Sequence, residues 1–563
     1  MKERATEGNT RPWIVHYDER VSDTLEYEST LLSQYLERSS RRFPDRTALI
    51  FEGYRLTYRQ LQLQVDRFAS CLMEFGVSKG DRVALVLPNV IPCVVACHAV
   101  LKAGGIVVMN NPLYTDRELE YQLDNSGARV LVTLDLLANR MIALRPKTSV
   151  RQIVVTSIGD YLPFPKNLLF PLVARKRNLA AKVQSAEGVY FWKSLQKKVR
   201  PPFVSPSISS EDIAMLQYTG GTTGISKGVM LTHGNLSRQV QQIAAWFPDF
   251  SQDRETLLGA LPFFHVFGLT TAMNLSIVMG WTNVLIAKPQ PEQLLSAIKR
   301  FSPSFAPMVP TMYIGILNHP GIHNTDLSSI KGCFSGSAPL PVEVIREFEE
   351  KTGGVIVEGF GLTETSPVTH INPFLEGRRK VGSIGIPIPD TDCRIVDLAN
   401  DKKVLGKNEV GELQIKGPQV MKGYWSMPDE TADVLQDGWL KTGDCGRMDE
   451  DGYFYIVDRI KDMIISGGFN VYPREIDEVF YEHPKVKEAC AIGIRHPTRG
   501  EAIKVFVVPN EGMEVDKREL MEFCKEKLAK YKWPAEIEFR KDLPKSNVGK
   551  ILRKKLRKNE SQT

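Results

Sequence analysis

An alternation of strand-like and helix-like segments near the start of the chain most constrains its fold. The order is strand, turn, helix, strand, helix, strand, over residues 83–87, 88–89, 91–101, 106–109, 115–123 and 130–132. A glycine pair at 104–105 separates the first helix from the second strand. Strands that alternate with helices are typical of largely parallel sheets. The pattern predicts an α/β fold, and no internal repeat is visible.

The length of the chain requires more than one hydrophobic core. It has 563 residues, whereas single cores stop growing at about 250–300 residues. Near Asp458 the chain becomes polar after a strand-like run at 453–457, and a glycine pair, a helix pattern at 474–483 and a basic tail follow. We therefore expect an N-terminal domain at 1–458 and a C-terminal domain at 459–563.

Composition and charge narrow the classes of function. Hydrophobic residues make up 42% of the chain and charged residues 25%, which excludes disordered and collagen-like classes. The formal charge of +6 suits polyanions such as ATP and CoA, or an anionic membrane surface, but over this length it predicts no nucleic-acid partner. The charged N-terminus is unlike a secretory signal, and no apolar run reaches the roughly 18 residues of a membrane span.

The eight cysteines are scattered without the spacing of a disulfide framework. We therefore expect free thiols in a cytoplasmic protein, and leave open a peripheral position on the inner face of the membrane and a homodimeric state. Cys93, Cys97 and His98 are close enough in sequence to suggest a metal site. They lie in an apolar run typical of a buried helix, so we favour the helix.

The segment from Gly159 to Lys182 has two interpretations. It combines an apolar patch with basic side chains: Leu168, Leu169, Phe170, Leu172 and Val173 with Lys166, Arg175, Lys176, Arg177 and Lys182. A basic amphipathic segment can lie on an anionic membrane. We favour the alternative, a surface insertion whose apolar side packs on the domain.

The most informative motif is a glycine- and threonine-rich loop, YTGGTTGISKG at 218–228. Glycines let backbone N–H groups approach an anion, hydroxyls donate further hydrogen bonds and a lysine adds charge, so such a loop can hold phosphates. Lys227 is followed by Gly228 rather than by serine or threonine, which disfavours a Walker loop and hence a P-loop kinase or ATPase. Taken alone, the loop also fits a surface turn.

Other motifs weaken that alternative: SGSAPL at 335–340, EGFGLTET at 358–365, DGWLKTGD at 437–444, the segment 458–473 and KSNVGKILR at 545–553. Together and in this order they resemble the adenylate-forming superfamily of acyl-CoA ligases, luciferases and peptide-synthetase adenylation domains. Phe360 stands where tyrosine is commoner, which keeps stacking on adenine but loses a phenolic hydrogen bond. The resemblance implies an α/β protein, α+β overall, with αβ-layered sheets and a β-barrel-like part in a large N-terminal domain and a small mobile C-terminal domain.

The resemblance also assigns an ATP and AMP site. It places Thr219, Thr222, Thr223 and Lys227 on the β- and γ-phosphates and Thr363 on the α-phosphate. Glu364 would bind Mg²⁺, a hard cation that suits a carboxylate, and Thr219 is a second candidate ligand. Asp444 would accept hydrogen bonds from both ribose hydroxyls beside Arg459. The remaining nucleotide-side residues that it implies are Gly220, Gly221, Gly224, Gly336, Ser337, Ala338, Glu358, Gly359, Phe360, Gly361 and Ile456.

The implied reaction has two steps, with ATP, a fatty acid and CoA as substrates. Lys550 would bridge the carboxylate and α-phosphate oxygens while the acyl-adenylate forms. The C-terminal domain would then rotate about a hinge at Lys461, and Gly467 and Gly468 would line a tunnel for the CoA arm. His265, in LPFFHVFG at 261–268, would gate the fatty-acid carboxylate; a histidine bonded to the backbone is the competing interpretation.

Within the superfamily the resemblance is greatest to bacterial long-chain fatty acyl-CoA ligases. It rests on LQYT at 216–219, on the block at 437–473 and on PKSNVGK at 544–550. A medium-chain or 4-coumarate-like aryl ligase and a fatty acyl-AMP ligase are the enzymatic alternatives, and a catalytically silent membrane scaffold is the alternative from another class. Chain-length preference depends on tunnel depth, since each buried methylene contributes about 0.8 kcal/mol.

Overall fold

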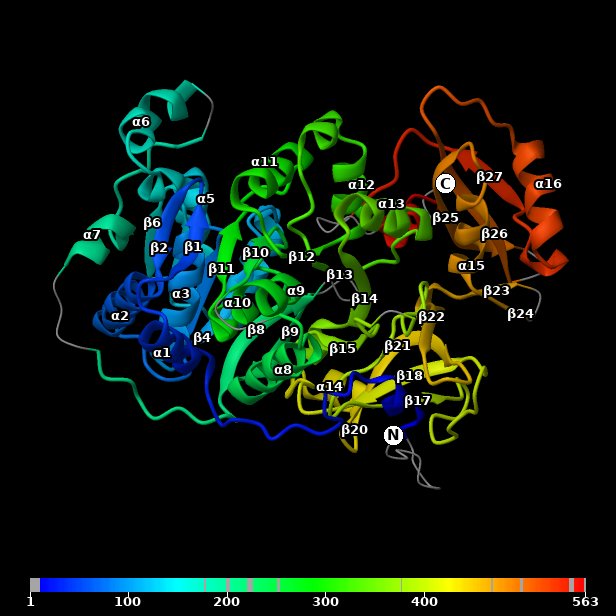
Figure 1. Cartoon of the computed structure of the whole chain (residues 1–563), viewed down its shortest axis with the longest axis horizontal. Helices are drawn as coiled ribbons and strands as arrows, with labels where there is room; N and C mark the ends of the chain where they lie inside the picture. The colour runs from blue at the N-terminus through cyan, green and yellow to red at the C-terminus, as the bar shows by residue number, and fades with distance from the viewer. Residues whose placement is uncertain are drawn as a thin grey trace.

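The computed structural model describes residues 11–176, 179–198, 203–219, 226–250, 254–375, 377–466, 469–496, 500–545 and 551–560. The strands of these residues form two large sheets in the N-terminal part, an antiparallel sheet beside them and a further sheet in the C-terminal part (Figure 1). The small C-terminal part lies to one side of the large one (Figure 1).

The strand–helix alternation at 83–132 builds the centre of one large sheet, so that prediction is confirmed. β3, β4 and β5 pair in parallel there, with α3 and α4 as the connections. The sheet has the order β19 (Gly423–Tyr424), β9 (Lys227–Thr232), β8 (Ile213–Thr219), β4 (Ile106–Asn110), β3 (Arg82–Val86), β5 (Val130–Leu134), β6 (Gln152–Thr156) and β7 (Val189–Phe191).

The second large sheet lies beside the first. Its central strands are parallel, and antiparallel pairs close it at both ends. Its order is β16 (Ile386–Pro387), β15 (Val368–Ile371), β14 (Val355–Gly361), β13 (Gly332–Ser335), β12 (Phe305–Met308), β10 (Thr256–Gly259), β11 (Thr282–Leu285), β1 (Thr47–Phe51) and β2 (Tyr54–Thr57).

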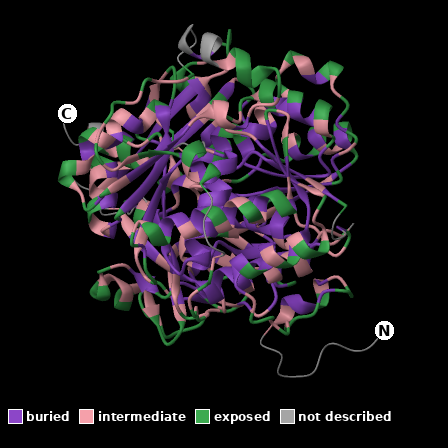
Figure 2. Ribbon diagram, turned by 90° about the vertical axis from the view of Figure 1, so that its left-hand side faces the viewer, coloured by how far each residue is buried: buried purple, intermediate pink, exposed green. Residues whose placement is uncertain are grey.

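Burial on both faces explains why the strands of these sheets are apolar throughout. In β3, Val83 and Leu85 join the main hydrophobic core, whereas Ala84 and Val86 join a second cluster on the opposite face. Helices whose side chains belong to the main core include α1 (Leu32–Arg42), α2 (Tyr58–Glu74), α3 (Ile91–Lys102), α8 (His233–Trp246) and α10 (Leu275–Met279). Helices that cover the second cluster are α4 (Asp116–Ser126) and α5 (Asp135–Leu144). Figure 2 shows how completely the strands are buried.

Further helices connect the strands of these layers, and those at 266–268, 291–301, 310–317 and 342–352 also add side chains to the main core. They are α6 (Lys166–Lys176), α7 (Trp192–Lys197), α9 (Val266–Gly268), α11 (Pro291–Phe301), α12 (Pro310–Leu317), α13 (Val342–Thr352) and α14 (Pro428–Val434). A π-helical segment, η4 (Leu269–Asn274), joins α9 to α10. π-Helical turns are rare and occur frequently at functional sites.

A separate antiparallel sheet lies in the N-terminal part, for which the resemblance implies a β-barrel-like part. It contains β17 (Asp392–Val396), β18 (Gly411–Lys416), β21 (Trp439–Met448), β20 (Leu435–Gln436) and β22 (Phe454–Arg459). The C-terminal sheet contains β24 (Phe469–Val471), β23 (Ile464–Ser466), β26 (Gly500–Pro509), β25 (Val486–His496) and β27 (Glu536–Phe539), with helices α15 (Pro473–Tyr481), α16 (Lys517–Lys527) and α17 (Arg553–Glu560).

The C-terminal part has hydrophobic clusters of its own, built from residues at 464–556. This agrees with the mixed α/β fold of a large and a small domain; the boundary at 458/459 stays a prediction. All helical residues of α3, including Cys93, Cys97 and His98, are buried as predicted. Among the described residues no group of His, Cys, Asp or Glu side chains has a metal-binding arrangement.

The eight cysteines are free thiols, and all except Cys393 are buried. Over the part of the chain that the structure describes, the helices lack the length and apolar character that crossing a bilayer requires.

The favoured interpretation of the 159–182 segment is wrong for part of its apolar patch. Phe170 packs on Gly159, where a Cβ atom would lie 2.6 Å from the ring. Leu168 and Leu169, by contrast, are 66% and 55% exposed. The side chains of Leu172 and Val173 lie outside the described residues.

Candidate functional site

The two ends of the predicted phosphate loop are held side by side. Thr219, the last residue of β8, pairs with Lys227, the first residue of the antiparallel strand β9. The Ser226 hydroxyl donates a 2.7 Å hydrogen bond to the Thr219 carbonyl oxygen. The loop therefore leaves and re-enters the sheet at one point, with Lys227 at its base. Gly220, Gly221, Thr222, Thr223 and Gly224 lie outside the described residues.

Tyr424 joins this loop to the carboxylate predicted to bind Mg²⁺. Its strand, β19, pairs with β9, and the Lys227 Nζ atom lies 4.8 Å from the centre of the Tyr424 ring. The Tyr424 hydroxyl donates a 2.8 Å hydrogen bond to Oε1 of Glu364. Burial and the Glu364 charge both raise the pKa of Tyr424, so it stays a donor at neutral pH. Among the described residues none donates a hydrogen bond to Glu364 Oε2, and a carboxylate oxygen suits a hard cation such as Mg²⁺.

Buried neutral groups hold the loop of Glu364 in place. Gln239 of α8 accepts a 2.5 Å hydrogen bond from the Val368 backbone N–H, and Thr270 of η4 donates a 2.8 Å bond to the Ser366 carbonyl. The Ser366 hydroxyl in turn donates to the Gln419 carbonyl at 2.8 Å. Gln239, Thr270 and Ser366 are all fully buried, so water cannot substitute for these bonds. Thr363 and Glu364 lie half-buried in η6 (Thr363–Thr365), at the start of the same loop.

Glu358 joins the two predicted adenine-side motifs. It pairs with Ser335 on the neighbouring strand. Its carboxylate accepts backbone hydrogen bonds from Leu340 at 3.3 Å and Gly382 at 3.2 Å. Burial raises the pKa of Glu358, and the positive charge of Arg474 partly opposes the shift. The helix α15, which carries Arg474, therefore acts electrostatically on this corner of the site.

Close backbone contacts explain the glycines of these motifs. A Cβ on Gly361 would lie 1.9 Å from the Pro367 carbonyl oxygen, so no side chain fits there. A Cβ on Gly336 would lie 3.2 Å from the Phe267 ring and 3.4 Å from the Gly359 carbonyl oxygen. Gly336 is thus in contact with both the 358–365 motif and the 261–268 motif. Ser337, which follows it, is exposed with a positive φ of 73°, and Ala338 is half-buried.

An aromatic row connects the 358–365 motif to β22. The half-buried Phe360 ring lies edge-on to His370, with their centroids 6.0 Å apart, and His370 meets Phe454 at 4.8 Å. Burial lowers the pKa of His370 to about 3, so the imidazole is neutral. Phe454 begins the strand β22, which also contains Ile456 and Arg459, two residues predicted to lie on the nucleotide side.

His265 caps the short helix that follows it. Its Nδ1 atom accepts a 3.3 Å hydrogen bond from the Phe267 backbone N–H. Desolvation lowers the pKa of His265 to about 4, so it is neutral at pH 7 and cannot supply a positive charge. Gln217, two residues before Thr219, donates a 2.5 Å hydrogen bond to the neighbouring Phe264 carbonyl. The histidine segment is therefore fixed directly to the strand that leads into the phosphate loop.

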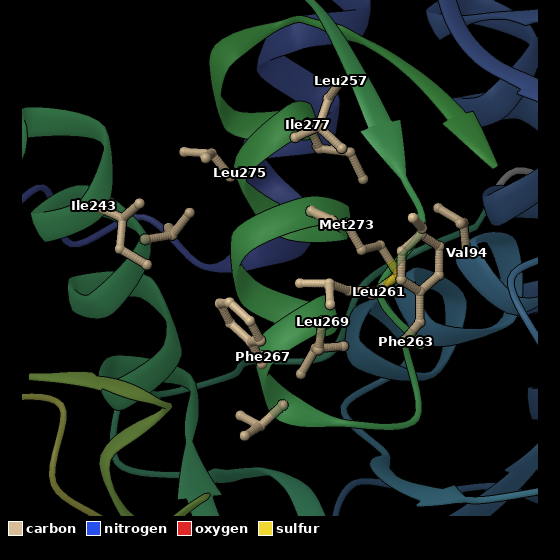
Figure 3. Packing of buried hydrophobic residues seen from close by; sticks show 14 of the residues in the cluster. Val94, Ile243, Leu257, Leu261, Phe263, Phe267, Leu269, Met273, Leu275 and Ile277 are labelled. Atoms are coloured by element: carbon tan, nitrogen blue, oxygen red, sulfur yellow. The ribbon is translucent and has the colours of Figure 1, made fainter. Parts of the chain in front are cut away.

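The helix after His265 lies in an apolar environment. Figure 3 shows side chains of α3, α8 and β10 gathered around α9, η4 and α10, with Val94 beside Phe263 and Ile243 facing the helix. The residues labelled there are buried members of the main core: Val94, Ile243, Leu257, Leu261, Phe263, Phe267, Leu269, Met273, Leu275 and Ile277.

Asp444 and Arg459 form the predicted ribose-side pair. They lie opposite each other on β21 and β22, and the Arg459 Nε atom is 2.5 Å from Asp444 Oδ1. Asp444 is buried, whereas the Arg459 side chain is one-third exposed. The Ile456 carbonyl accepts a 2.9 Å hydrogen bond from the Arg474 guanidinium.

The predicted hinge accepts hydrogen bonds from the C-terminal helix α17. Lys461 lies in the short turn η7 (Ile460–Asp462). The Arg557 guanidinium of α17 donates to the Lys461 carbonyl at 3.3 Å, to the Asp462 carbonyl at 2.9 Å and to the Asp462 carboxylate at 2.8 Å. Because α17 follows the KSNVGKILR motif, one helix connects that motif to the hinge. Lys550, Gly467 and Gly468 themselves lie outside the described residues.

Sequence reasoning missed several residues that organise this site. Tyr424, Gln239, Arg474 and Arg557 are not in the motif positions to which the resemblance assigned roles. Tyr424 follows a glycine and precedes a tryptophan at the edge of the first large sheet, and this aromatic pair is the only sequence signal for it. The other three act through contacts between segments far apart in the chain.

Comparisons with known proteins show the family of this chain. The AMP-binding enzyme family matches residues 36–425, and the AMP-binding enzyme C-terminal domain matches residues 475–550. A long-chain-fatty-acid–CoA ligase of Bacillus subtilis (strain 168) is 48% identical over 98% of each chain, and one of Yersinia pestis is 41% identical over 97% of this chain and 98% of that one.

Among solved structures, the anthranilate CoA ligase AuaEII in complex with anthranoyl-AMP superposes with a TM-score of 0.84 at 26% identity. The match covers 96% of this chain and 98% of that one. Family matches, relatives and structural neighbour thus agree with one another, and this chain is a member of the adenylate-forming, AMP-binding enzyme family.

Proposed function

We propose that the protein is an AMP-forming long-chain fatty acid–CoA ligase. It joins ATP and a fatty acid to an acyl-adenylate with release of pyrophosphate, and then transfers the acyl group to CoA with release of AMP. The single observation that carries the proposal is the contact chain Lys227–Tyr424–Glu364, which places the cation of the phosphate loop and a carboxylate on one tyrosine. The near full-length likeness to curated long-chain-fatty-acid–CoA ligases supports the choice of acid.

Adenylation requires the enzyme to hold two anions together. A fatty-acid carboxylate is ionised at neutral pH and repels the triphosphate. Lys227, Thr219 and the loop glycines and threonines between them neutralise and hold the β- and γ-phosphates, while Thr363 contacts the α-phosphate. Lys550 approaches the carboxylate and α-phosphate oxygens as a mobile cation. These preorganised donors stabilise the charge that grows on the leaving pyrophosphate.

Glu364 holds the Mg²⁺ that accompanies ATP, and Thr219 is the candidate second contact. Mg²⁺ usually takes one or two protein carboxylates together with water and phosphate oxygens, so a single well-oriented glutamate fits the requirement. When bound, the ion neutralises phosphate charge. The Tyr424 hydroxyl orients the carboxylate, as outer-shell donors of metal ligands commonly do.

The adenine and ribose are held on the other side of the site. Phe360 stacks on the base beside Gly336, Ser337, Ala338, Gly359 and Gly361, with Glu358 behind them. Asp444, oriented by Arg459, accepts from the ribose hydroxyls, and Ile456 lies on the same strand. Because the pKa of His265 is about 4, this residue acts as a neutral gate for the fatty-acid carboxylate and not as an acid or base.

Thioester formation uses the same carbonyl carbon from another direction. The C-terminal domain, residues 459–563, rotates about Lys461 and carries Lys550 away. Gly467 and Gly468 then line the passage of the CoA arm, where a side chain would obstruct it. The thiol sulfur attacks the carbonyl carbon, the bond to AMP breaks, and the thiol proton leaves to solvent. We place the reaction in the cytoplasm, where ATP and CoA are dissolved.

The test is AMP release by the purified enzyme with ATP, Mg²⁺ and CoA across saturated acids of increasing length and aryl acids. We expect release that depends on CoA and is greatest with long chains. Preference for aryl or medium-chain acids would replace the substrate assignment. Acyl-adenylate that forms but is not converted to acyl-CoA and AMP when CoA is present would indicate a fatty acyl-AMP ligase, and the absence of both adenylate and AMP would refute the proposal.

A further inference from the structure

The helix α6 presents an apolar surface to solvent. Within the described residues, positions 164–169 form an uninterrupted exposed run that includes Phe164, Leu168 and Leu169, which are 78%, 66% and 55% exposed. Most other exposed large apolar side chains stand singly, as Val204, Val342 and Met513 do. Single exposed apolar residues are normal on a protein surface, whereas a group of them marks an interaction site.

The helix is firmly attached on its other side. Phe170 lies against Gly159, and Ala174, one helical turn further, is buried. Figure 1 shows α6 standing at the periphery of the molecule, beyond β6. The inner face of the helix is therefore packed on the protein, whereas the exposed apolar residues face solvent.

The charge of this segment selects an anionic partner. Residues 161–186 contain five basic side chains and no acidic one, and so account for five of the six net positive charges of the chain. The preceding acidic residue, Asp160, accepts hydrogen bonds from the Thr156 hydroxyl and the Ser157 N–H, and Lys193 lies 3.4 Å from it. Its charge is thus compensated by the protein, and the segment remains strongly positive.

We propose that α6 and the exposed run at 164–169, which begins just before the helix, dock the enzyme on the surface of an anionic phospholipid bilayer. Apolar side chains flanked by lysine and arginine are the chemistry that such a surface recognises, because the side chains enter the headgroup region while the cations meet the phosphates. The biological reason rests on the proposed function, since long-chain fatty acids partition into membranes. The surface places the enzyme where its acid substrate is concentrated.

Co-sedimentation with vesicles of phosphatidylcholine, with and without phosphatidylglycerol, tests the proposal on the full-length protein. We expect binding to the anionic vesicles that weakens as salt is raised. The triple variant Phe164→Ser, Leu168→Ser, Leu169→Ser should bind at least about tenfold more weakly. Lys166→Gln, which removes one positive charge, should weaken binding about fivefold.

The matched control replaces three scattered apolar residues of similar exposure, Val204→Ser, Val342→Ser and Met513→Ser, which are 77%, 57% and 53% exposed. It should bind anionic vesicles as the wild type does. The proposal would be overturned if the wild-type protein bound neither kind of vesicle, or if the triple variant bound anionic vesicles as tightly as the wild type does. A concentration-dependent dimer that the triple variant abolishes would assign the surface to a second copy instead.

Sedimentation requires no catalysis, so its result is independent of the ligase assignment. If the enzyme proves active, the triple variant should form acyl-CoA at the wild-type rate from a short, water-soluble acid. It should be slower only when a long-chain acid is supplied in anionic vesicles. Equal slowing with both acids would show a damaged fold rather than a lost docking surface.

Discussion

The loop that carries Glu364 and the turn that carries Lys461 are held in different ways. Gln239, Thr270 and Gln419 fix the first through neutral groups that are fully buried. The second is held by the ion pair of Arg557 and Asp462, whose side chains are 29% and 15% exposed. A buried hydrogen bond is costly to break, whereas a partly hydrated ion pair exchanges readily with water.

The difference matches what each region must do under the proposed function. The phosphates and the acid need fixed donors, so their loop gains from bonds that water cannot replace. A hinge must release one set of contacts and form another within each turnover, so weak contacts suit it. The loop of Glu364 is thus held rigid by buried neutral hydrogen bonds, whereas the turn of Lys461 is held by a partly exposed ion pair that can open.

The largest effect on catalysis is expected from Lys550→Ala, a change in the C-terminal domain that is proposed to rotate. Loss of this cation should slow acyl-adenylate formation about 10²–10³-fold, because a donor to the developing charge is removed. Thioester formation from supplied acyl-adenylate should change less than about twofold. Both rates are measured by rapid quench, with exposed Lys555→Ala as the control. Equal loss in both half-reactions would mean that Lys550 does not leave the site.

Low pH should lower the folding stability of the large N-terminal part, which contains the loop of Glu364. His98, His233 and His370 are buried, and burial lowers their pKa values to about 4, about 4 and about 3. Unfolded histidines titrate near pH 6.5, so the stability that these buried neutral residues contribute is present above about pH 6.5 and is lost as the pH falls toward 4. By pH 5 the free energy of unfolding should have fallen by about 2 kcal/mol per histidine.

Calorimetry at pH 7 and pH 5 should therefore show a lower unfolding temperature for the large part at pH 5. His98→Leu removes one titrating group, so it should flatten the dependence. Unfolding temperatures that coincide at the two pH values would contradict the burial of neutral histidines in this part.

Gln239→Leu should remove one of the buried supports of the Glu364 loop. The Val368 N–H would be left buried without an acceptor, which lowers the free energy of unfolding by about 1–3 kcal/mol. Pyrophosphate exchange should fall with it, because Glu364 is displaced. The exposed Gln293→Leu on α11 is the control. Chemical denaturation of both variants gives the comparison, and equal stabilities would show that Gln239 supports nothing.

Tyr424→Phe should separate the two contacts of this tyrosine. The phenyl ring keeps its place beneath Lys227, while the hydrogen bond to Glu364 is lost. We expect the Mg²⁺ concentration that gives half-maximal adenylation to rise about tenfold, as when other outer-shell partners of metal ligands are removed. The KM for CoA should stay unchanged. A loss confined to the KM for CoA would place Tyr424 elsewhere in the mechanism.

The smallest effect on stability is expected from Arg557→Ala. Because its ion pair with Asp462 is partly exposed, the free energy of unfolding should fall by less than about 1 kcal/mol. The ratio of the two half-reaction rates should nevertheless shift several-fold, because the hinge loses its bond to α17. The neighbouring exposed Lys558→Ala should leave that ratio unchanged. An unaltered ratio in Arg557→Ala would remove it from the hinge mechanism.

Periodicity and local motifs were sufficient to predict much of this molecule. The buried α3 and the strands around it follow from apolar runs separated by turns.

Contacts between distant segments could not be predicted in this way. Gln239 and Val368 are 129 residues apart, Arg557 and Asp462 are 95 apart, and Tyr424 and Glu364 are 60 apart. Which glutamine or arginine meets which loop depends on how the sheets stack, and a single sequence carries no local signal for that. The exposure of Leu168 and Leu169 was likewise mispredicted, since an apolar patch does not state which way it faces.

The most direct test of the account is a two-stage single-turnover experiment. Enzyme mixed with Mg²⁺, ATP and a long-chain fatty acid, without CoA, should accumulate about one acyl-adenylate per active site, and later addition of CoA should convert it to acyl-CoA and AMP. If no adenylate forms, or if it forms and CoA leaves it untouched, the assignment of two steps to one fixed and one moving region is contradicted.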